Sequence, residues 1–299
     1  MPKFKAWIAA ARLRTLPLSV SGIIVGSAVA KKYSLFQPEI FWLAILTTIG
    51  FQVLSNFAND YGDGIKGADD HREGEKRMVA SGLISAKQMK YGIMMTAFVT
   101  LSIAVNLIYA AFGWEDFFNS LLFLVLGIIS IVAALKYTIG KNAYGYFGLG
   151  DVFVFLFFGL LSVLGSNYLF THELKWDLLL PASSIGLFSM AVLNLNNMRD
   201  IENDKKNKKN TLVVSLGSLK AKIYHYILIS LGMVLTLLYS GINYHSINKF
   251  TYCIAFIPLW LNLVTVYKNK EPKLLDNELK KVALSTFLFA ILFGFSLNI

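Results

Sequence analysis

The stretch Asn56-Phe-Ala-Asn-Asp-Tyr-Gly-Asp-Gly-Ile-Lys-Gly-Ala-Asp-Asp70 decides how the rest of the chain is interpreted. It follows an apolar run, residues 40–54, and places its aspartates just past the end of that run. Carboxylates at the boundary of a membrane are costly and usually functional. Asp60 and Asp63 lie three residues apart, so a continuing helix presents both on one face. The stretch therefore predicts a membrane helix that ends in an acidic site.

Composition indicates the class of protein. The 299 residues are 56% hydrophobic and 15% charged, and the mean hydropathy of +0.56 is too high for an ordinary soluble protein. A bilayer core requires about 20 mostly apolar residues per helix. We therefore expect an all-α membrane protein that forms a single domain over residues 1–299, with nine transmembrane helices. The predicted spans are 16–30, 40–58, 91–111, 117–135, 151–170, 178–197, 223–239, 250–266 and 282–297.

Basic residues are distributed unevenly around these spans. If the N-terminus is cytoplasmic, all but four of the 28 Lys and Arg residues fall on the cytoplasmic side. The four exceptions are Lys31, Lys32, Lys175 and Lys249. The positive-inside rule then predicts an N-in/C-out topology, and we attribute Arg12 and Arg14 mainly to topology. The net charge of +10 suits anionic membrane lipid and phosphorylated substrates, and gives no reason to expect nucleic acid.

A second acidic cluster ends another apolar run. The stretch Asn194-Leu-Asn-Asn-Met-Arg-Asp-Ile-Glu-Asn-Asp204 follows residues 178–193. Its Asp200 and Asp204 are four residues apart and share a face if the helix continues. Either cluster alone is compatible with a solvated helix end. Two clusters, both ending inward-running spans and four spans apart, favour a shared function.

Three cytoplasmic segments carry groups suited to anions. The loop after the second span contains Arg77 before a turn of small residues. The segment Lys136-Tyr-Thr-Ile-Gly-Lys-Asn-Ala-Tyr-Gly-Tyr-Phe-Gly-Leu-Gly-Asp151 combines glycines, tyrosines and lysines, which is typical of a flexible loop with hydrogen-bond donors. Asp151 opens the fifth span, where it either caps the helix or lines the same cavity. The basic run 205–209 serves either topology and lipid contact or diphosphate binding.

The two acidic clusters predict a particular chemistry. Mg²⁺ prefers oxygen ligands, commonly one or two carboxylates together with substrate phosphates and water. Two carboxylate pairs from separate helices can hold one or two Mg²⁺ facing a diphosphate, while Lys and Arg take the remaining charge. The metal would neutralise a leaving diphosphate. A charged cytoplasmic rim above an apolar bundle suits a polyprenyl diphosphate.

At these residues the chain resembles the UbiA superfamily of intramembrane aromatic prenyltransferases. The first family motif, roughly Asn-x-x-x-Asp-x-x-x-Asp, is matched at Asn59 and Asp63, with the last carboxylate displaced to Asp69. The second motif, Asp-x-x-x-Asp, is met by Asp200 and Asp204. The resemblance implies that the metal ligands are Asp63, Asp69, Asp200 and Asp204.

Longer blocks narrow the resemblance to the MenA branch, the 1,4-dihydroxy-2-naphthoate polyprenyltransferases of menaquinone synthesis. The blocks are residues 11–18, 55–63, 137–159 and 196–204, and the match runs from about residue 11 to residue 284. One departure is Lys208, where we expect the glycine of a Gly-Lys turn.

The resemblance implies nine helices around a central cavity in the bacterial inner membrane, with the active site facing the cytoplasm. It also implies Mg²⁺-assisted transfer of a polyprenyl group from polyprenyl diphosphate to 1,4-dihydroxy-2-naphthoate, with loss of CO₂. The catalytic residues implied are Asp63, Asp151, Asp200, Asp204 and Tyr137. The substrate-binding residues implied are Asn56, Asn59, Asp60, Arg72, Arg77, Lys136, Lys141, Asn196, Arg199 and Lys209.

Two alternative functions remain open at this stage. The acceptor can instead be 4-hydroxybenzoate, homogentisate or a haem precursor. A cation-coupled transporter also carries intramembrane carboxylates, but transport favours aspartates deep within spans and helices broken by Gly or Pro. Here the aspartates cluster at the ends of spans, which favours the enzyme.

Overall fold

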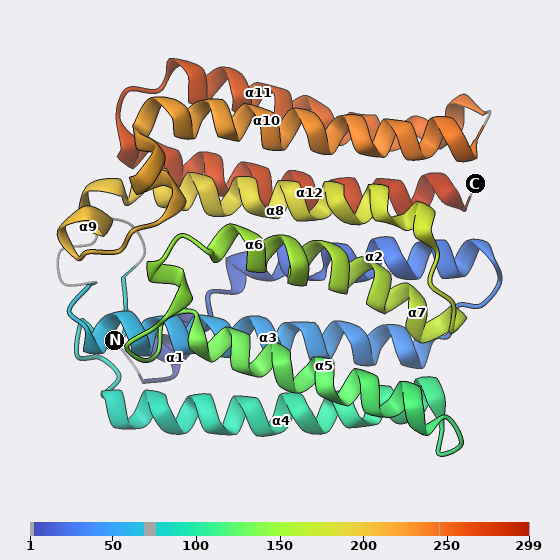
Figure 1. The fold of residues 1–299 in the computed structure, drawn as a ribbon, viewed down its shortest axis with the longest axis horizontal. Helices are drawn as coiled ribbons and strands as arrows, with labels where there is room; N and C mark the ends of the chain where they lie inside the picture. The colour runs from blue at the N-terminus through green and yellow to red at the C-terminus, as the bar shows by residue number, and fades with distance from the viewer. Residues whose placement is uncertain (1–2, 69–75, 245, 299) are drawn as a thin grey trace.

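The computed structural model describes residues 3–68, 76–244 and 246–298 of the chain. Within these ranges, nine helical segments are long and apolar enough to cross a membrane. They lie side by side along the long axis of the molecule, and the two termini lie at opposite ends of the bundle (Figure 1). The all-α membrane fold predicted from the sequence is confirmed.

The helices follow one another in a simple order. They are α1 (Lys3–Ala11), α2 (Leu16–Lys32), α3 (Pro38–Ile65), α4 (Ala86–Phe112), α5 (Phe117–Lys136), α6 (Gly150–Val154), α7 (Ser166–Thr171), α8 (Leu179–Arg199), α9 (Ile201–Lys206), α10 (Leu212–Asn243), α11 (Phe256–Lys268) and α12 (Leu275–Leu297). A π-helical segment, Phe155–Gly165, joins α6 to α7 in the fifth span. Short 3₁₀ segments are Leu13–Thr15, Tyr144–Tyr146, Trp176–Leu178, Ile247–Ala255 and Pro272–Leu274.

Most helices extend beyond the spans predicted from hydropathy. Helix α3 continues to Ile65, so Asp60 and Asp63 are part of the helix. Helix α10 begins at Leu212, where the Thr211 side chain accepts a hydrogen bond from the Val214 amide at 3.3 Å, and it kinks at Gly217, whose φ is +78°. Hydropathy detects only the apolar part of a helix, whereas caps and polar turns extend it past the bilayer core.

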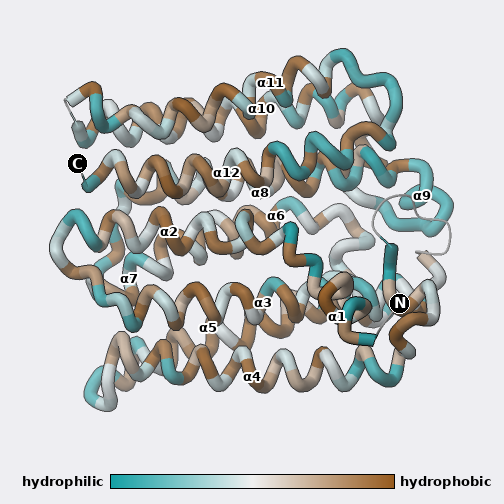
Figure 2. The backbone as a smooth tube through the Cα atoms, turned by 180° about the vertical axis from the view of Figure 1, so that it is seen from behind, coloured by the Kyte–Doolittle hydropathy of each residue, from teal (hydrophilic) through white to brown (hydrophobic). Residues whose placement is uncertain are grey.

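The polar parts of the chain collect at one end of the bundle. Figure 2 shows hydrophilic residues gathered around α9 and the N-terminal end, and hydrophobic residues along the lengths of the helices. Helix α8 packs against α10 and α12, α2 against α12, and α3 against α4. Both acidic clusters therefore lie at the same end of the molecule.

The first span is interrupted at Arg12. This residue adopts a left-handed backbone conformation with φ +49° and ψ +60°, so α1 and α2 do not form one straight helix. Left-handed backbone is unfavourable for L-residues and ends a right-handed helix. The break places Arg12 and Arg14 at the wall of the cavity described next.

Candidate active site

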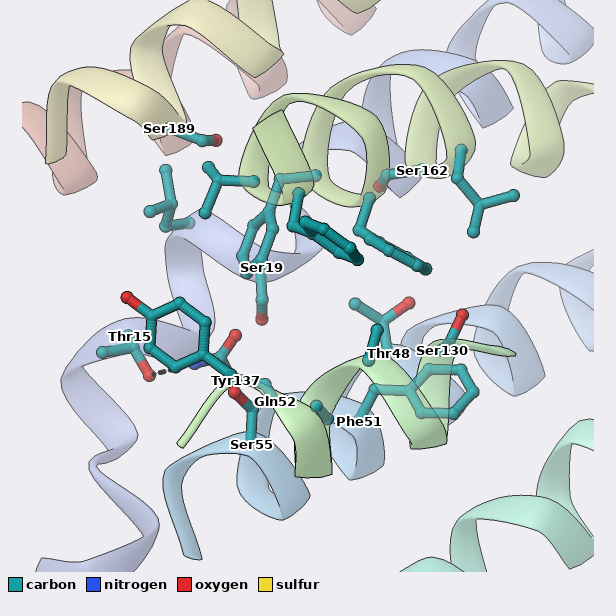
Figure 3. Close-up of a pocket in the computed structure, with 18 of the residues that line it drawn as sticks. Thr15, Ser19, Thr48, Phe51, Gln52, Ser55, Ser130, Tyr137, Ser162 and Ser189 are labelled. Atoms are coloured by element: carbon teal, nitrogen blue, oxygen red, sulfur yellow. Dashed lines mark hydrogen bonds between the residues drawn. The ribbon is translucent and has the colours of Figure 1, made fainter. Parts of the chain in front are cut away.

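A cavity of about 390 Å³ lies within the bundle. It is lined by α2, α3, α4, α5, α8 and the segment from Gly150 to Leu169, and most of its lining atoms are apolar. Figure 3 shows hydroxyl and amide side chains, among them Thr15, Gln52 and Ser189, among the aromatic and aliphatic ones. Its size falls within the range of small-molecule sites.

The structure brings about half of the predicted site residues to the wall of this cavity. Those that line it are Asn56, Asn59, Asp63, Arg77, Tyr137, Asn196 and Lys209. Those that lie near its charged end or on the surface without lining it are Asp60, Lys136, Lys141, Asp151, Arg199, Asp200 and Asp204. Asp69 and Arg72 lie outside the described residues.

Asp63 is the centre of the charged end. Its carboxylate is 3% exposed, accepts a hydrogen bond from Tyr146 Oη at 2.8 Å, and lies 3.5 Å from Lys209 Nζ and 3.9 Å from Arg77 Nη2. The Lys66 ammonium stacks over the Tyr146 ring at 4.0 Å. Partial burial lowers the pKa of Lys66, while the charge of Asp63 opposes that shift. One carboxylate therefore lies among several cations, as a site for an anion and a metal requires.

Asp60 has a different position from the one expected. Its two carboxylate oxygens accept hydrogen bonds from the backbone amides of Met78 and Val79, at 3.0 and 2.8 Å, and the residue is 1% exposed. Asp60 therefore holds the loop that carries Arg77 against α3, and its carboxylate faces that loop instead of the cavity. Spacing along the helix cannot reveal this, because the partners lie 18 and 19 residues further along the chain.

The second cluster forms where α8 turns into α9. Asp200 joins the two helices and is held by Arg199, whose Nε and Nη2 donate to its two oxygens at 2.8 Å each. Arg199 Nη2 also donates to Asn196 Oδ1 at 2.7 Å. The Asp204 amide donates to the Asp200 carbonyl at 2.8 Å, so the helical register continues through the turn.

Direct contacts join the two acidic clusters. The side-chain amides of Asn203 and Asn207 donate to the Ala68 carbonyl at 2.9 and 3.2 Å. Lys209 donates its backbone N–H to the Asp204 carbonyl at 2.9 Å, while its ammonium pairs with Asp63. Aspartates separated by well over a hundred residues thus belong to one charged assembly.

The glycine-rich segment 137–149 closes the assembly from a third side. Tyr137 lines the cavity, and its ring meets that of Tyr144 edge-on at 5.3 Å. A Cβ on Gly145 would lie 2.6 Å from the Tyr137 carbonyl oxygen, so only glycine allows this approach. Burial raises the pKa of the Tyr144 hydroxyl, which stays protonated and donates to the Ala133 carbonyl at 2.9 Å. The segment therefore fixes Tyr137 at the wall.

Two lysines and one aspartate in or beside this segment do not line the cavity. Lys136 and Lys141 are exposed. Asp151 is in the first turn of α6 without capping it, and its carboxylate accepts a hydrogen bond from Tyr224 Oη of α10 at 3.1 Å. Helix α10 therefore decides the orientation of this carboxylate.

The donor set of the charged end fits Mg²⁺. Buried carboxylates are available at Asp63, Asp200 and Asp204, and each of the first two is paired with basic side chains that a dication and a diphosphate can replace. The part of the chain that the structure describes contains no compact group of three or more His, Cys, Asp or Glu side chains. Mg²⁺ does not require such a cage, because substrate phosphates and water complete its shell.

Part of the cavity wall was not predicted from the sequence. Arg12, Arg14, Thr15 and Gln52 all line the cavity, and Gln52 Nε2 donates to Thr15 Oγ1 at 3.0 Å. The only sequence signal was the pair of arginines before the first span, which the positive-inside rule accounted for equally well.

Comparison with known proteins shows to which family this architecture belongs. A sequence model of the UbiA prenyltransferase family matches residues 19–295. The chain is 41% identical to the 1,4-dihydroxy-2-naphthoate octaprenyltransferase of Haemophilus influenzae, covering 99% of this chain and 97% of that protein. It is 40% identical to the Escherichia coli protein of the same name, covering 96% and 94%.

Solved structures share the fold at low sequence identity. A UbiA homolog from Aeropyrum pernix superposes with a TM-score of 0.71 at 13% identity, covering 96% of this chain and 98% of that chain. A UbiA homolog from Archaeoglobus fulgidus bound to GPP and Mg²⁺ gives 0.66 at 14% identity, covering 98% and 100%. With the family model matching almost the whole chain, this protein belongs to the UbiA prenyltransferase family.

Proposed function

We propose that this protein transfers a polyprenyl group from polyprenyl diphosphate to 1,4-dihydroxy-2-naphthoate in menaquinone biosynthesis. The allylic C–O bond of the donor breaks and diphosphate leaves. The ring carbon that bears the carboxylate attacks the allylic carbon, and the carboxylate is lost as CO₂, which restores the aromatic ring. The products are a demethylmenaquinol, diphosphate and CO₂.

The choice of 1,4-dihydroxy-2-naphthoate as the acceptor rests on one observation. Relatives named 1,4-dihydroxy-2-naphthoate octaprenyltransferase are 40–41% identical over nearly the whole chain. The cavity supports the same reaction class, since its charged end at Asp63 leads into an apolar chamber that is lined by α2, α4 and α5. The alternative function, a cation-coupled transporter, has no comparable support.

The charged end is proposed to bind the diphosphate. Asp63, Asp69, Asp200 and Asp204 would hold Mg²⁺, which when bound neutralises the leaving diphosphate and lowers the barrier to breaking the allylic bond. Arg77 and Lys209, now paired with Asp63, would exchange that partner for phosphate oxygens. Arg72 would join them.

The remaining predicted residues are proposed to bind and orient the substrates. Asn56, Asn59 and Asn196 present amide groups at the wall between the charged end and the apolar chamber. Tyr137 would orient the naphthoate ring, and so would Asp151, which follows the cavity-lining Gly150 and is held by Tyr224. Lys136 and Lys141 are exposed at the same end, where they would attract anionic substrates.

The charge pattern supports a proposal for the placement in the cell. We propose a single membrane domain over residues 1–299 in the bacterial inner membrane, with the acidic clusters facing the cytoplasm. Packing of α2 against α12 supports one domain, because it joins the first span to the last. The predominance of basic residues around the Asp63 end supports the orientation.

The proposed function is tested by a turnover assay on the purified protein in detergent. The protein is incubated with 1,4-dihydroxy-2-naphthoate, a long-chain polyprenyl diphosphate and Mg²⁺, and products are identified by mass spectrometry. We expect a prenylated, decarboxylated naphthoquinol that forms with Mg²⁺ and is absent with EDTA. Parallel reactions with 4-hydroxybenzoate and homogentisate serve as acceptor controls. Product with one of these acceptors alone would overturn the proposed acceptor and keep the prenyl donor.

A further inference from the structure

Asp276 lies in the first turn of α12, outside both acidic motifs, and does not line the cavity. A carboxylate in this position is stabilised by the partial positive charge of the helix N-terminus. Its side chain is 36% exposed, yet it contacts two cations that belong to distant parts of the chain. These contacts connect the last span to the charged end of the cavity.

The two partners of Asp276 are arginines. Oδ1 accepts a hydrogen bond from Arg199 Nη1 at the end of α8. Oδ2 accepts one from Arg14 Nη1, just before α2, at 3.3 Å. Asp276 thus bridges the start of the first span to the end of the sixth.

Both arginines lead directly to the site. Arg14 lines the cavity. Arg199 has a side chain only 2% exposed, and it grips Asp200 with Nε and Nη2 while Nη2 also holds the cavity-lining Asn196. Any change at Asp276 is therefore transmitted to Asp200 through one rigid guanidinium.

Charge sharing gives this bridge a consequence for metal binding. Arg199 divides its positive charge between Asp200 and Asp276. If the charge of Asp276 is removed, a larger share of the charge of the buried guanidinium falls on Asp200, and the Asp200 carboxylate becomes less available to a dication. Arg14 simultaneously loses its ion pair with Asp276.

We propose that Asp276 is a positioning residue for the Mg²⁺–diphosphate end of the site, acting through Arg199 on Asp200 and through Arg14 on the cavity wall. The proposal rests on the proposed function, since it assigns Asp200 to the metal. Removing the partner of a ligating carboxylate typically weakens metal binding or activity by about 10- to 100-fold.

A matched control lies two residues away. Glu278 is in the same first turn of α12 and is 6% exposed. It contacts Asn262 at 2.8 Å and Lys281 at 2.6 Å, a separate network that involves neither arginine. Glu278→Gln therefore perturbs the anchoring of α12 without touching the bridge.

The test measures Mg²⁺-dependent binding of a non-hydrolysable farnesyl thiodiphosphate by calorimetry, on the full-length protein in detergent. Asp276→Asn should raise the Mg²⁺ concentration for half-maximal binding by about tenfold. Asp276→Glu, which keeps the charge, should recover most of that loss. Glu278→Gln should leave the Mg²⁺ dependence at the wild-type value, even if it lowers the melting temperature. Melting temperature and gel filtration verify that each variant is folded.

The outcomes separate the two proposals. A folded Asp276→Asn protein with wild-type Mg²⁺ dependence would overturn the role of Asp276 and leave the proposed function intact. So would an equal shift in Glu278→Gln, which would show that α12 acts only as a structural support. A wild-type protein that binds no thiodiphosphate with Mg²⁺ would overturn both proposals. If Asp276→Asn does not fold, Asp276→Ser takes its place: a tenfold shift of the Mg²⁺ dependence that Asp276→Glu does not show supports the role, and a wild-type dependence in Asp276→Ser contradicts it.

Discussion

Asp63 is a carboxylate that folding has surrounded with positive charge. Lys209 and Arg77 lie within 4 Å of it, and Tyr146 donates a hydrogen bond to it. These cations balance the charge of the buried carboxylate and are positioned to pair with an anion that enters the site. In the proposed site, this residue would hold the metal next to the diphosphate, at the place where the ion pairs now lie.

At this scale the first prediction concerns Asp63→Asn. An amide cannot neutralise the two cations or serve as an anionic ligand, so we expect prenyl transfer to fall by at least about 100-fold. The measurement is the rate of product formation at saturating donor and Mg²⁺, with gel filtration to verify folding. Asp204→Asn is expected to behave alike.

The matched control for that variant is Asp116→Asn. Asp116 caps α5 by accepting the Asn119 amide at 3.1 Å, and asparagine is an equally good cap. It belongs to the turn between α4 and α5, and this turn lies at the opposite end of the bundle from α9 (Figure 1). We expect full activity in Asp116→Asn and loss of activity in Asp63→Asn. Near-normal turnover in Asp63→Asn would contradict the assignment of this residue to the metal site.

A second prediction at the residue scale concerns Lys208. Its φ is +54°, a left-handed conformation that glycine adopts without strain. The departure seen in the sequence, a lysine where the turn favours glycine, therefore has a structural cost. Lys208→Gly should stabilise the protein by about 0.5–1 kcal/mol and leave turnover unchanged. A thermal melt in detergent measures the effect, and a lowered melting temperature would contradict the assigned strain.

The π-helical segment and α8 pack backbone against backbone at Gly159. A Cβ built on Gly159 would lie 2.7 Å from the Ala182 carbonyl oxygen and 2.7 Å from the Cα of Gly186. Small residues allow such close approach between membrane helices, where van der Waals packing replaces the hydrophobic effect. The segment lines the cavity on one side and packs on α8 on the other, so its position affects the cavity shape. π-helical turns of this kind often occur at functional sites.

At the element scale we predict the effect of Gly159→Ala. The added methyl has to push α8 and the π-helical segment apart, which should destabilise the protein by about 1–3 kcal/mol and reduce prenyl transfer. Thermal melting and turnover measure both effects. Gly241→Ala is the control, because nothing lies within 4 Å of a Cβ built there and alanine favours the helix. Equal stability of the two variants would exclude tight packing at Gly159.

The whole molecule has a polar end and an apolar body. Hydrophilic residues collect near α9, and the turn between α4 and α5 lies at the other end (Figures 1 and 2). The termini are also at opposite ends, as an odd number of crossings requires. With the basic residues concentrated at the Asp63 end, the positive-inside rule predicts that this end faces the cytoplasm.

The orientation is predicted at the scale of the whole molecule. In a Cys253→Ser background, which removes the single native cysteine, we place new cysteines at the exposed Glu115 and Glu202. A membrane-impermeant maleimide should label Glu115→Cys in intact bacterial spheroplasts. It should label Glu202→Cys only after the membrane is permeabilised. The reverse pattern would place the acidic clusters on the outside.

The sequence by itself determined the class, the approximate position of each span and the end of the bundle that carries the acidic clusters. These properties follow from local hydropathy and from charges counted along the chain, so a window of neighbouring residues contains enough information. The helices were predicted too short, because caps such as Thr211 allow helical turns beyond the apolar core. The motifs also located Asp63, Tyr137 and Asn196, which line the cavity.

Only the tertiary structure decided which partner each polar side chain has. Asp60 turns to a loop backbone, Tyr146 reaches Asp63 across 83 residues, and Asp276 joins Arg14 across 262 residues and Arg199 across 77. No periodic pattern contains such pairings, since they depend on which helix ends the packing of the bundle brings together. Burial then makes each pairing obligatory, because a charge removed from water must find a partner nearby.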